Sequence, residues 1–307
     1  GDPLPDPEGS LLKAAPKLSY SMGVGSKNLV SIHGGHSGEF CNHAKDTLEE
    51  VIQAYIAKGF SWVGITDHAP PPDDRFLDAG ERKAGQGAQE LQERFGRYIQ
   101  SCRSLQEKYA DRITVLVGFE GEAYTGYKEH TEALLQKYQP DYFIGSVHHV
   151  RDEFFDADEE QYASIASKLG GVVPMYCEYF DTQYSQIEAL KPPVIGHFDY
   201  IRIFDPHYAD TLQHPDVKQR IERNLESVRT YGLIMDFNVS PLWEGGTEPF
   251  PSGWILKRAC ELGIRVIPGD DSHGTKTVGS GIEDGIRILK EAGFDTAFPL
   301  PHFRESA

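Results

Sequence analysis

Cysteine is scarce in this chain, and its cysteines are far apart. The 307 residues contain four, Cys41, Cys102, Cys177 and Cys260, with no CxxC pair. Secreted disulfide scaffolds and cysteine-based structural zinc sites both need clustered cysteines, so both classes are disfavoured. The opening segment GDPLPDPEGS lacks the apolar core of a signal peptide. We therefore expect a reduced, cytoplasmic protein.

Long apolar runs and positive charge are scarce too. No run of about 18 apolar residues occurs, which argues against a membrane-spanning helix. There are 30 Lys and Arg against 47 Asp and Glu, giving a formal net charge of −17 at pH 7. This charge repels nucleic-acid backbones and anionic lipid, so we expect no nucleic-acid partner and no membrane partner. A small phosphorylated substrate stays compatible with it, because bound cations reverse the local field.

Short apolar segments alternate with amphipathic ones along most of the chain. Residues 1–27, rich in Pro, Gly and Ser, are expected to form a flexible lead-in. Strands are predicted at 29–33, 62–66, 113–119, 142–147, 193–197, 232–237 and 264–268. Helices are predicted at 46–59, 89–109, 127–138, within 159–190, and at 215–230, 251–262 and 281–292, with a polar loop at 69–88. Seven βα units without a linker predict one α/β domain over 28–307, with a parallel sheet closed or nearly closed into a barrel. A doubly wound open sheet is the alternative.

Histidines and carboxylates follow nearly every predicted strand. They are His33, His36, Asp67, His68, Glu120, His148, His149, His197, Asp271 and His273, with Asn238 after the sixth strand. A single histidine is more often a core or surface residue than a ligand. In a βα barrel, however, the carboxyl ends of the strands converge on one face, so these side chains would share a pocket. Imidazoles mixed with carboxylates favour a centre of several metal ions that hydrolyses phosphoesters.

Seven motifs occur in an order that is typical of one family. They are FCNHAKDTLEE, GITDHAPPP, GFEGEAYTGY, GSVHHV, KPPVIGHFDYIRIF, MDFNVSP and GDDSH. Through them the chain, from about residue 29 to 292, resembles the PHP (polymerase and histidinol phosphatase) superfamily and its histidinol-phosphate phosphatase branch. The resemblance implies a distorted (βα)7 TIM-like barrel holding two to three divalent ions, Zn, Mn or Fe. It also implies phosphomonoester hydrolysis, with histidinol phosphate of histidine biosynthesis as the favoured substrate.

The resemblance implies a ligand set for each ion. The first ion would be held by His33, His36, Glu120 and Asp271; the second by Glu120, His148 and His197; and the third by His43, His68 and His273. The family's first motif usually reads HxH, whereas this chain reads HGGH from His33 to His36. We expect the conformational freedom of glycine to restore the geometry through a bulge.

Four further residues are candidates for contact with the substrate or for proton transfer. Arg202 is expected to hold phosphate oxygens and stabilise the transition state, with a surface salt bridge as the alternative. Glu122 is expected to bind a substrate ammonium or to orient a metal ligand. Asp67 is a proton carrier or an orienting partner of His68. Asn238 contacts the substrate or supports the ligands.

Two other functions stay open at this point. One is a PHP phosphoesterase acting on another small metabolite or a nucleotide. The other is a non-catalytic metal-binding protein with a degenerate site, which the HGGH insertion keeps in consideration. No sequence pattern indicates an oligomeric state.

Overall fold

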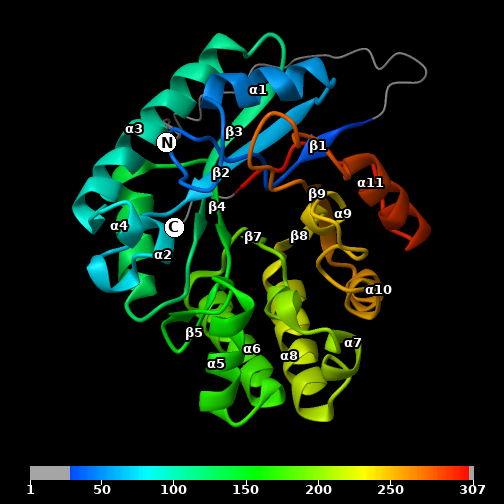
Figure 1. Cartoon of the computed structure of the whole chain (residues 1–307). Helices are drawn as coiled ribbons and strands as arrows, with labels where there is room; N and C mark the ends of the chain where they lie inside the picture. Colours follow the sequence, from blue (N-terminus) through cyan, green and yellow to red (C-terminus); the bar gives the residue numbers. More distant parts are fainter. Residues whose placement is uncertain (1–27, 304–307) are drawn as a thin grey trace, which may run out of the picture.

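A curved sheet of seven parallel strands forms the centre of the computed structural model, which describes residues 28–303 (Figure 1). In spatial order the strands are β1 (Val30–Ser31), β2 (Trp62–His68), β3 (Thr114–Gly121), β4 (Tyr142–Gly145), β7 (Val194–Ile195), β8 (Ile234–Asn238) and β9 (Arg265–Gly269). Their order follows the chain and never reverses, as it would in a doubly wound sheet. The Ile32 N–H donates to the Pro268 carbonyl over 2.9 Å and links the two ends of the sheet. The predicted, nearly closed barrel is therefore confirmed, and the open-sheet alternative is wrong.

Helices surround the sheet on its outer side (Figure 1). They are α1 (Leu48–Ala57), α2 (Ala79–Lys83), α3 (Ala88–Lys108), α4 (Tyr127–Tyr138), α5 (Glu159–Leu169), α6 (Val172–Leu190), α7 (Tyr208–Thr211), α8 (Pro215–Tyr231), α9 (Ser240–Trp243), α10 (Gly253–Glu261) and α11 (Ile282–Glu291). In α1, Leu48, Val51, Ile52 and Tyr55 form the buried face. Thr47 caps its amino end by accepting a hydrogen bond from the Glu50 N–H at 3.1 Å.

Some predicted segments differ from the observed ones. The polar loop 69–88 contains the 3-10 helix η1 (Asp74–Phe76) and α2, because the side chains of Asp73 and Asp78 cap two short turns. A second 3-10 helix, η2 (Tyr200–Phe204), and an antiparallel hairpin of β5 (His149–Val150) and β6 (Glu153–Phe154) were not predicted. The predicted lead-in, 1–27, lies outside the described residues.

Tyr142 of β4 fills space left by two glycines. Its hydroxyl donates to the Ile32 carbonyl beyond β1, so the side chain crosses β2 and β3. A Cβ on Gly64 would lie 1.8 Å from the Tyr142 hydroxyl oxygen, and one on Gly118 would lie 3.0 Å from its ring. The absence of side chains at these glycines therefore lets an aromatic residue pack against the sheet.

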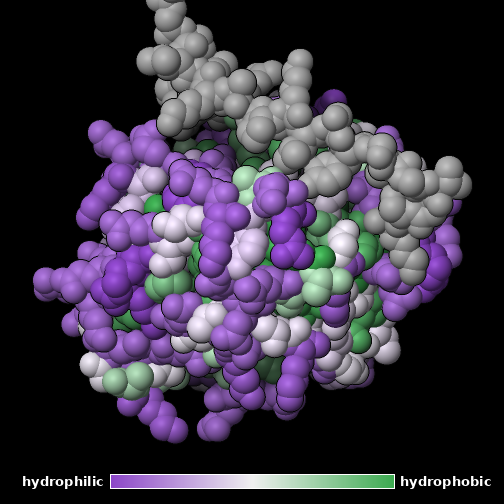
Figure 2. Space-filling model, turned by 90° about the horizontal axis from the view of Figure 1, so that it is seen from above, coloured by the Kyte–Doolittle hydropathy of each residue, from purple (hydrophilic) through white to green (hydrophobic). Residues whose placement is uncertain are grey.

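The face of the molecule seen in Figure 2 is mostly hydrophilic, in keeping with the net charge of −17. Within residues 28–303, no helix combines the length and the apolar character needed to cross a membrane.

Candidate active site

Two groups of metal-ligating side chains lie at the carboxyl ends of the strands. One contains His33, His36, Glu120 and Asp271, and the other contains Glu120, His148 and His197. In each group, one ligand atom per residue lies within 4.8 Å of the others. Glu120, the penultimate residue of β3, belongs to both groups and is 3% exposed. The structure thus brings together the side chains that were predicted to hold the first and second ions.

The contacts around Glu120 are short. Its Oε2 lies 2.6 Å from His33 Nε2, and its Oε1 lies 2.8 Å from His148 Nε2 and 3.4 Å from His197 Nε2. Asp271 Oδ1 lies 2.7 Å from His36 Nε2 and 3.3 Å from His33 Nε2. One carboxylate therefore joins the two groups, and a second one joins the two histidines of HGGH.

In three of these imidazoles, the Nδ1 atom, which faces away from the cluster, contacts a carboxylate. The Nδ1 atom of His33 lies 2.9 Å from Asp236, that of His36 lies 3.1 Å from Asp67, and that of His148 lies 2.6 Å from Glu122. Each Nδ1 thus meets a carboxylate, and each Nε2 faces the cluster. This arrangement is typical of histidines that bind metals.

The cluster contains buried polar atoms that lack hydrogen-bond partners. They include His33 Nε2 and both carboxylate oxygens of Glu120. His33 Nε2 and Glu120 Oε2 are in contact, but without hydrogen-bond geometry. A buried polar atom left unpaired costs about 1–3 kcal/mol, and more if it is charged. A divalent cation between these atoms would satisfy all of them, so the residues fit a metal centre.

The electrostatics of the pocket also favour added positive charge. Burial lowers the pKa of His33, but the nearby Asp271 and Glu120 carboxylates raise it well above its usual value. Burial raises the pKa of Glu120, but the neighbouring His33 and His148 lower it well below its usual value. The pocket therefore stabilises cationic imidazoles, and it would stabilise a metal ion for the same reason.

In the HGGH motif, the two glycines pack closely against β2 and α1. A Cβ on Gly34 would lie 2.4 Å from the Gly64 carbonyl oxygen, and one on Gly35 would lie 2.9 Å from Val51 Cγ1. Neither glycine has a positive φ, so the expected use of a glycine-specific conformation is wrong. Small size at these two positions lets the chain run against β2 and return His36 to the cluster.

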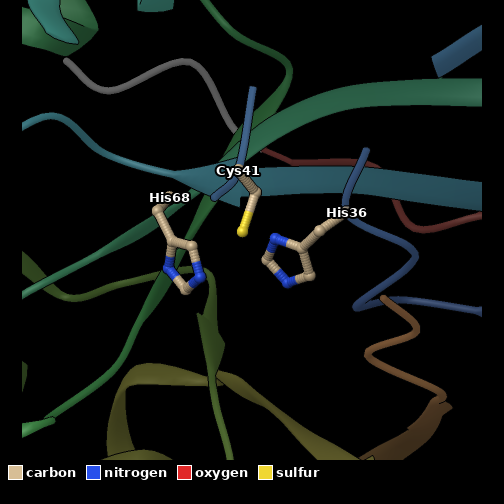
Figure 3. Close-up of side chains that lie close together, drawn as sticks. All are labelled: His36, Cys41 and His68. Carbon is tan, nitrogen blue, oxygen red and sulfur yellow. The ribbon is translucent and has the colours of Figure 1, made fainter. Parts of the chain in front are cut away.

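The set predicted for a third ion is not assembled. The His43 side chain is 59% exposed, and its Nε2 lies 3.5 Å from Asp78 Oδ2. The rings of His68 and His273 each stack on His36, at centroid distances of 4.6 and 4.7 Å. The group that forms around His68 contains His36 and Cys41 (Figure 3). The role of His43 as a ligand stays a prediction.

Asp67 and Glu122 make the contacts of orienting residues. Asp67 Oδ1 contacts His36 Nδ1 and accepts from the backbone N–H of His68, so its imidazole partner is His36 and the predicted pairing with the His68 ring is wrong. Glu122 contacts the Nδ1 atoms of His148 and His149 at 2.6 and 3.1 Å. His149 begins β5, packs on Phe154 and belongs to neither metal group, so its predicted place in the shared pocket is wrong. Substrate contact by Glu122 stays a prediction.

Arg202 is buried among its own partners. Its Nε lies 3.2 Å from Asp199 Oδ2, and its Nη2 donates to the carbonyls of Glu248 and Pro249 over 2.8 and 2.7 Å. The guanidinium carbon lies 4.1 Å from the Phe250 ring centroid. The alternative of a surface salt bridge is therefore wrong, because the pair is buried. Phosphate binding by Arg202 stays a prediction.

Asn238 contacts a ligand of the first group. Its Nδ2 donates to Asp271 Oδ2 over 3.2 Å, a contact that would support this ligand. Substrate contact by Asn238 stays a prediction. Sequence reasoning missed Asp236, two residues earlier on β8 and therefore on the same face of the strand. The proximity of Cys41 to His36 and His68 was not predicted either, although FCNH places Cys41 five residues after His36.

Comparisons with known proteins agree with this geometry. The model of the PHP domain matches residues 34–240. A protein of Schizosaccharomyces pombe named a probable histidinol-phosphatase is 35% identical over 254 residues, which cover 81% of this chain and 82% of that protein. The histidinol-phosphatase of Saccharomyces cerevisiae is 27% identical, over 80% of this chain and 84% of its own length.

Two solved structures share the fold. A candidate histidinol phosphatase, HisK, of Listeria monocytogenes superposes with a TM-score of 0.74 at 25% identity, covering 83% of this chain and 99% of its own. The histidinol phosphate phosphatase of Lactococcus lactis has a TM-score of 0.64 at 18% identity, covering 87% of this chain and 94% of its own. The family match and the fungal relative together show that this chain belongs to the PHP domain family, alongside its histidinol-phosphatases.

Proposed function

We propose that this chain is a metal-dependent phosphomonoester hydrolase whose substrate is histidinol phosphate. The observation that carries the proposal is the pair of ligand groups joined by Glu120, whose buried oxygens lack hydrogen-bond partners. The fungal relatives named histidinol-phosphatases support the substrate. The Lactococcus enzyme, which was solved with zinc, L-histidinol and phosphate, gives further support.

Two divalent ions fit the two groups, and Zn, Mn or Fe suits their mixture of imidazoles and carboxylates. Bound there, the ions would supply an activated water and neutralise charge on the phosphoryl group. Glu120 would hold both ions at a fixed separation. Asp236, Asp67 and Glu122 would keep three imidazoles oriented through their Nδ1 atoms.

Asp67 suits this orienting role better than that of a proton donor. Burial raises its pKa, but the hydrogen bond and charge of His36 outweigh burial and lower it below its usual value. An ionised Asp67 can hold the His36 proton but has none to give to a leaving alkoxide. We therefore assign Asp67 to positioning His36.

Specificity has to come from groups outside the metal cluster, because metal ligands alone accept almost any phosphomonoester. Histidinol phosphate adds an imidazole and an ammonium to the phosphate. A site that pairs those groups rejects analogues without them, by about 10⁴-fold at the upper end. We expect kcat/KM for histidinol phosphate to exceed the values for nucleoside monophosphates, sugar phosphates and glycerol phosphate.

The test is a substrate panel assayed with zinc- or manganese-loaded protein. A clear preference for histidinol phosphate supports the proposal. Equal or better turnover of another phosphomonoester would assign the chain to a different PHP activity, and no turnover of any of them would indicate a metal-binding protein without hydrolase activity.

A further inference from the structure

Asp271, a carboxylate of the first ligand group, has an unusual backbone conformation. Its φ is 47°, in the left-handed region that residues other than glycine seldom adopt. In this conformation its Oδ1 lies 2.7 Å from His36 Nε2 and 3.3 Å from His33 Nε2. Such a strained conformation persists only where the surrounding structure holds it. The contacts that hold Asp271 are therefore part of the site.

The peptide group between Asp270 and Asp271 is hydrogen-bonded on both sides. Its carbonyl oxygen, which belongs to Asp270, accepts from Trp243 Nε1 over 2.9 Å. Its N–H, which belongs to Asp271, donates to the His33 carbonyl over 2.9 Å. Because φ of Asp271 is a rotation relative to this peptide plane, the two bonds help to fix the direction in which the ligand side chain leaves the backbone.

The Asp270 side chain connects the same point of the chain to three other segments. Asp270 directly follows β9 and is fully buried. Its Oδ1 accepts from Ser31 Oγ, at the end of β1, and its Oδ2 accepts from the Gly279 N–H, before α11, each over 2.7 Å. The Tyr55 hydroxyl of α1 lies 2.8 Å from both carboxylate oxygens. Since β1 and α11 both contact β9 (Figure 1), one buried carboxylate joins these segments beside the metal ligand.

A purely structural role for Asp270 is the alternative, and Asp205 is an example of one. Asp205 is also buried, and it accepts from the Tyr176 hydroxyl, the Thr211 hydroxyl and the His207 N–H over 2.7, 2.8 and 2.9 Å. The donors are of the same three kinds as at Asp270, but the residue after Asp205 is a proline. Asp270 differs from it because the next residue is a metal-ligating carboxylate in a strained conformation.

We propose that Asp270 is a positioning residue, which holds Asp271 in the conformation that faces His33 and His36. Asp270 thereby raises the affinity of the first ligand group for its ion. This inference rests on the proposed metal-dependent function and deepens it. Asp270 is not itself a ligand, because its carboxylate oxygens face the donors on β1, on α1 and before α11.

Zinc affinity, measured by competition with a chelator, tests the proposal without measuring turnover. Asp270→Asn keeps the size of the side chain but offers one acceptor oxygen in place of two. We expect it to bind the zinc ion of the first group about 10–100-fold more weakly than the wild type does. Asp205→Asn is the matched control, because it loses the same kinds of hydrogen bond outside the ligand groups. Its zinc affinity should equal that of the wild type, even where its stability falls.

Tyr55→Phe distinguishes the position of the carboxylate from its charge. The change removes one hydroxyl donor but leaves the Asp270 carboxylate and the aromatic ring in place. We expect weaker zinc binding here too, by a smaller factor than in Asp270→Asn. At saturating zinc, KM for histidinol phosphate should match the wild type in both variants. Unchanged zinc affinity in Tyr55→Phe, beside weaker binding in Asp270→Asn, would assign the effect to charge alone and overturn the positioning role.

The other contrary results also have separate meanings. Equal zinc affinity in Asp270→Asn and the wild type, or an equal loss in Asp205→Asn, overturns the positioning role and leaves the Glu120 centre standing. A wild type that binds no zinc overturns this proposal and the proposed function together. Zinc binding with the expected order of affinities, but without hydrolysis of any phosphomonoester, supports the positioning role and overturns the proposed function alone. If Asp270→Asn fails to fold, the zinc affinity of Tyr55→Phe decides.

Discussion

At the scale of single residues, the site depends on carboxylates in two positions. Glu120 and Asp271 face the Nε2 atoms of the histidines, while Asp236, Asp67 and Glu122 face their Nδ1 atoms. The first kind would touch ions, and the second kind fixes the tautomer and direction of the rings. Substitutions in the two classes should therefore differ in severity.

Glu120→Gln removes the charge shared by the two ligand groups. Two cations held close together would then repel each other with less screening. We expect the loss of kcat/KM to exceed about 100-fold, the upper end for outer partners of metal ligands, with fewer ions bound per chain. Glu129→Gln, on the exposed face of α4, is the control. Near-normal turnover and metal content in Glu120→Gln would rule out the shared ligand.

Glu122→Gln tests an orienting carboxylate. The amide can still meet one imidazole, but it carries no charge to hold both His148 and His149. We expect a loss of about 10–100-fold in metal affinity or activity, with KM for histidinol phosphate little changed. A large rise in KM at full metal occupancy would instead favour the predicted contact with the substrate ammonium.

Arg202→Ala distinguishes a structural role of the guanidinium, as the partner of Asp199, from its predicted role in binding phosphate. The change leaves the buried Asp199 without its cation, which should lower the free energy of unfolding by about 3–5 kcal/mol. Urea denaturation measures this loss, and Arg229→Ala, at an exposed pair with Glu226, should change it little. Unchanged stability with a lower kcat would assign the guanidinium to the phosphate alone.

At the scale of elements, the path of the HGGH segment depends on the small size of its two glycines. Its glycines pack against the backbone of β2 and the side chains of α1. Gly34→Ala should cost at least about 1–3 kcal/mol of unfolding free energy and displace His33 or His36, which lowers the metal content. Gly253→Ala, at the start of α10 with only ordinary contacts, is the control. Thermal unfolding and metal analysis of both variants test this expectation. A Gly34→Ala variant with normal stability and metal content would show that the close packing of Gly34 against β2 is dispensable.

Hydrophobic patterning predicted the long elements well, because helices such as α1 bury one face and strands such as β2 are short apolar runs. It missed η1 and α2, which are stabilised by caps and hardly at all by buried faces. The inward position of Cys41 and the outward position of His43 could not be predicted either. They depend on the backbone hydrogen bonds of one turn, which periodicity does not report.

At the scale of the whole molecule, the barrel brings distant segments into one pocket. His33 and Asp271 are 238 positions apart in the sequence, yet their side chains are in contact. The histidines and carboxylates at the ends of the predicted strands, together with the predicted barrel, were enough to anticipate this convergence. The outer carboxylates were harder to assign, because a sequence shows which residues end a strand but not which nitrogen each carboxylate meets.

The central claim is that ions held around Glu120 carry the hydrolysis of histidinol phosphate, and one titration tests it most directly. Chelator-stripped protein is reloaded with zinc or manganese in steps, while bound metal and turnover are measured on the same samples. We expect no turnover without metal, and recovery as the two groups joined by Glu120 fill. Full turnover of the stripped protein with less than one ion per chain would contradict it.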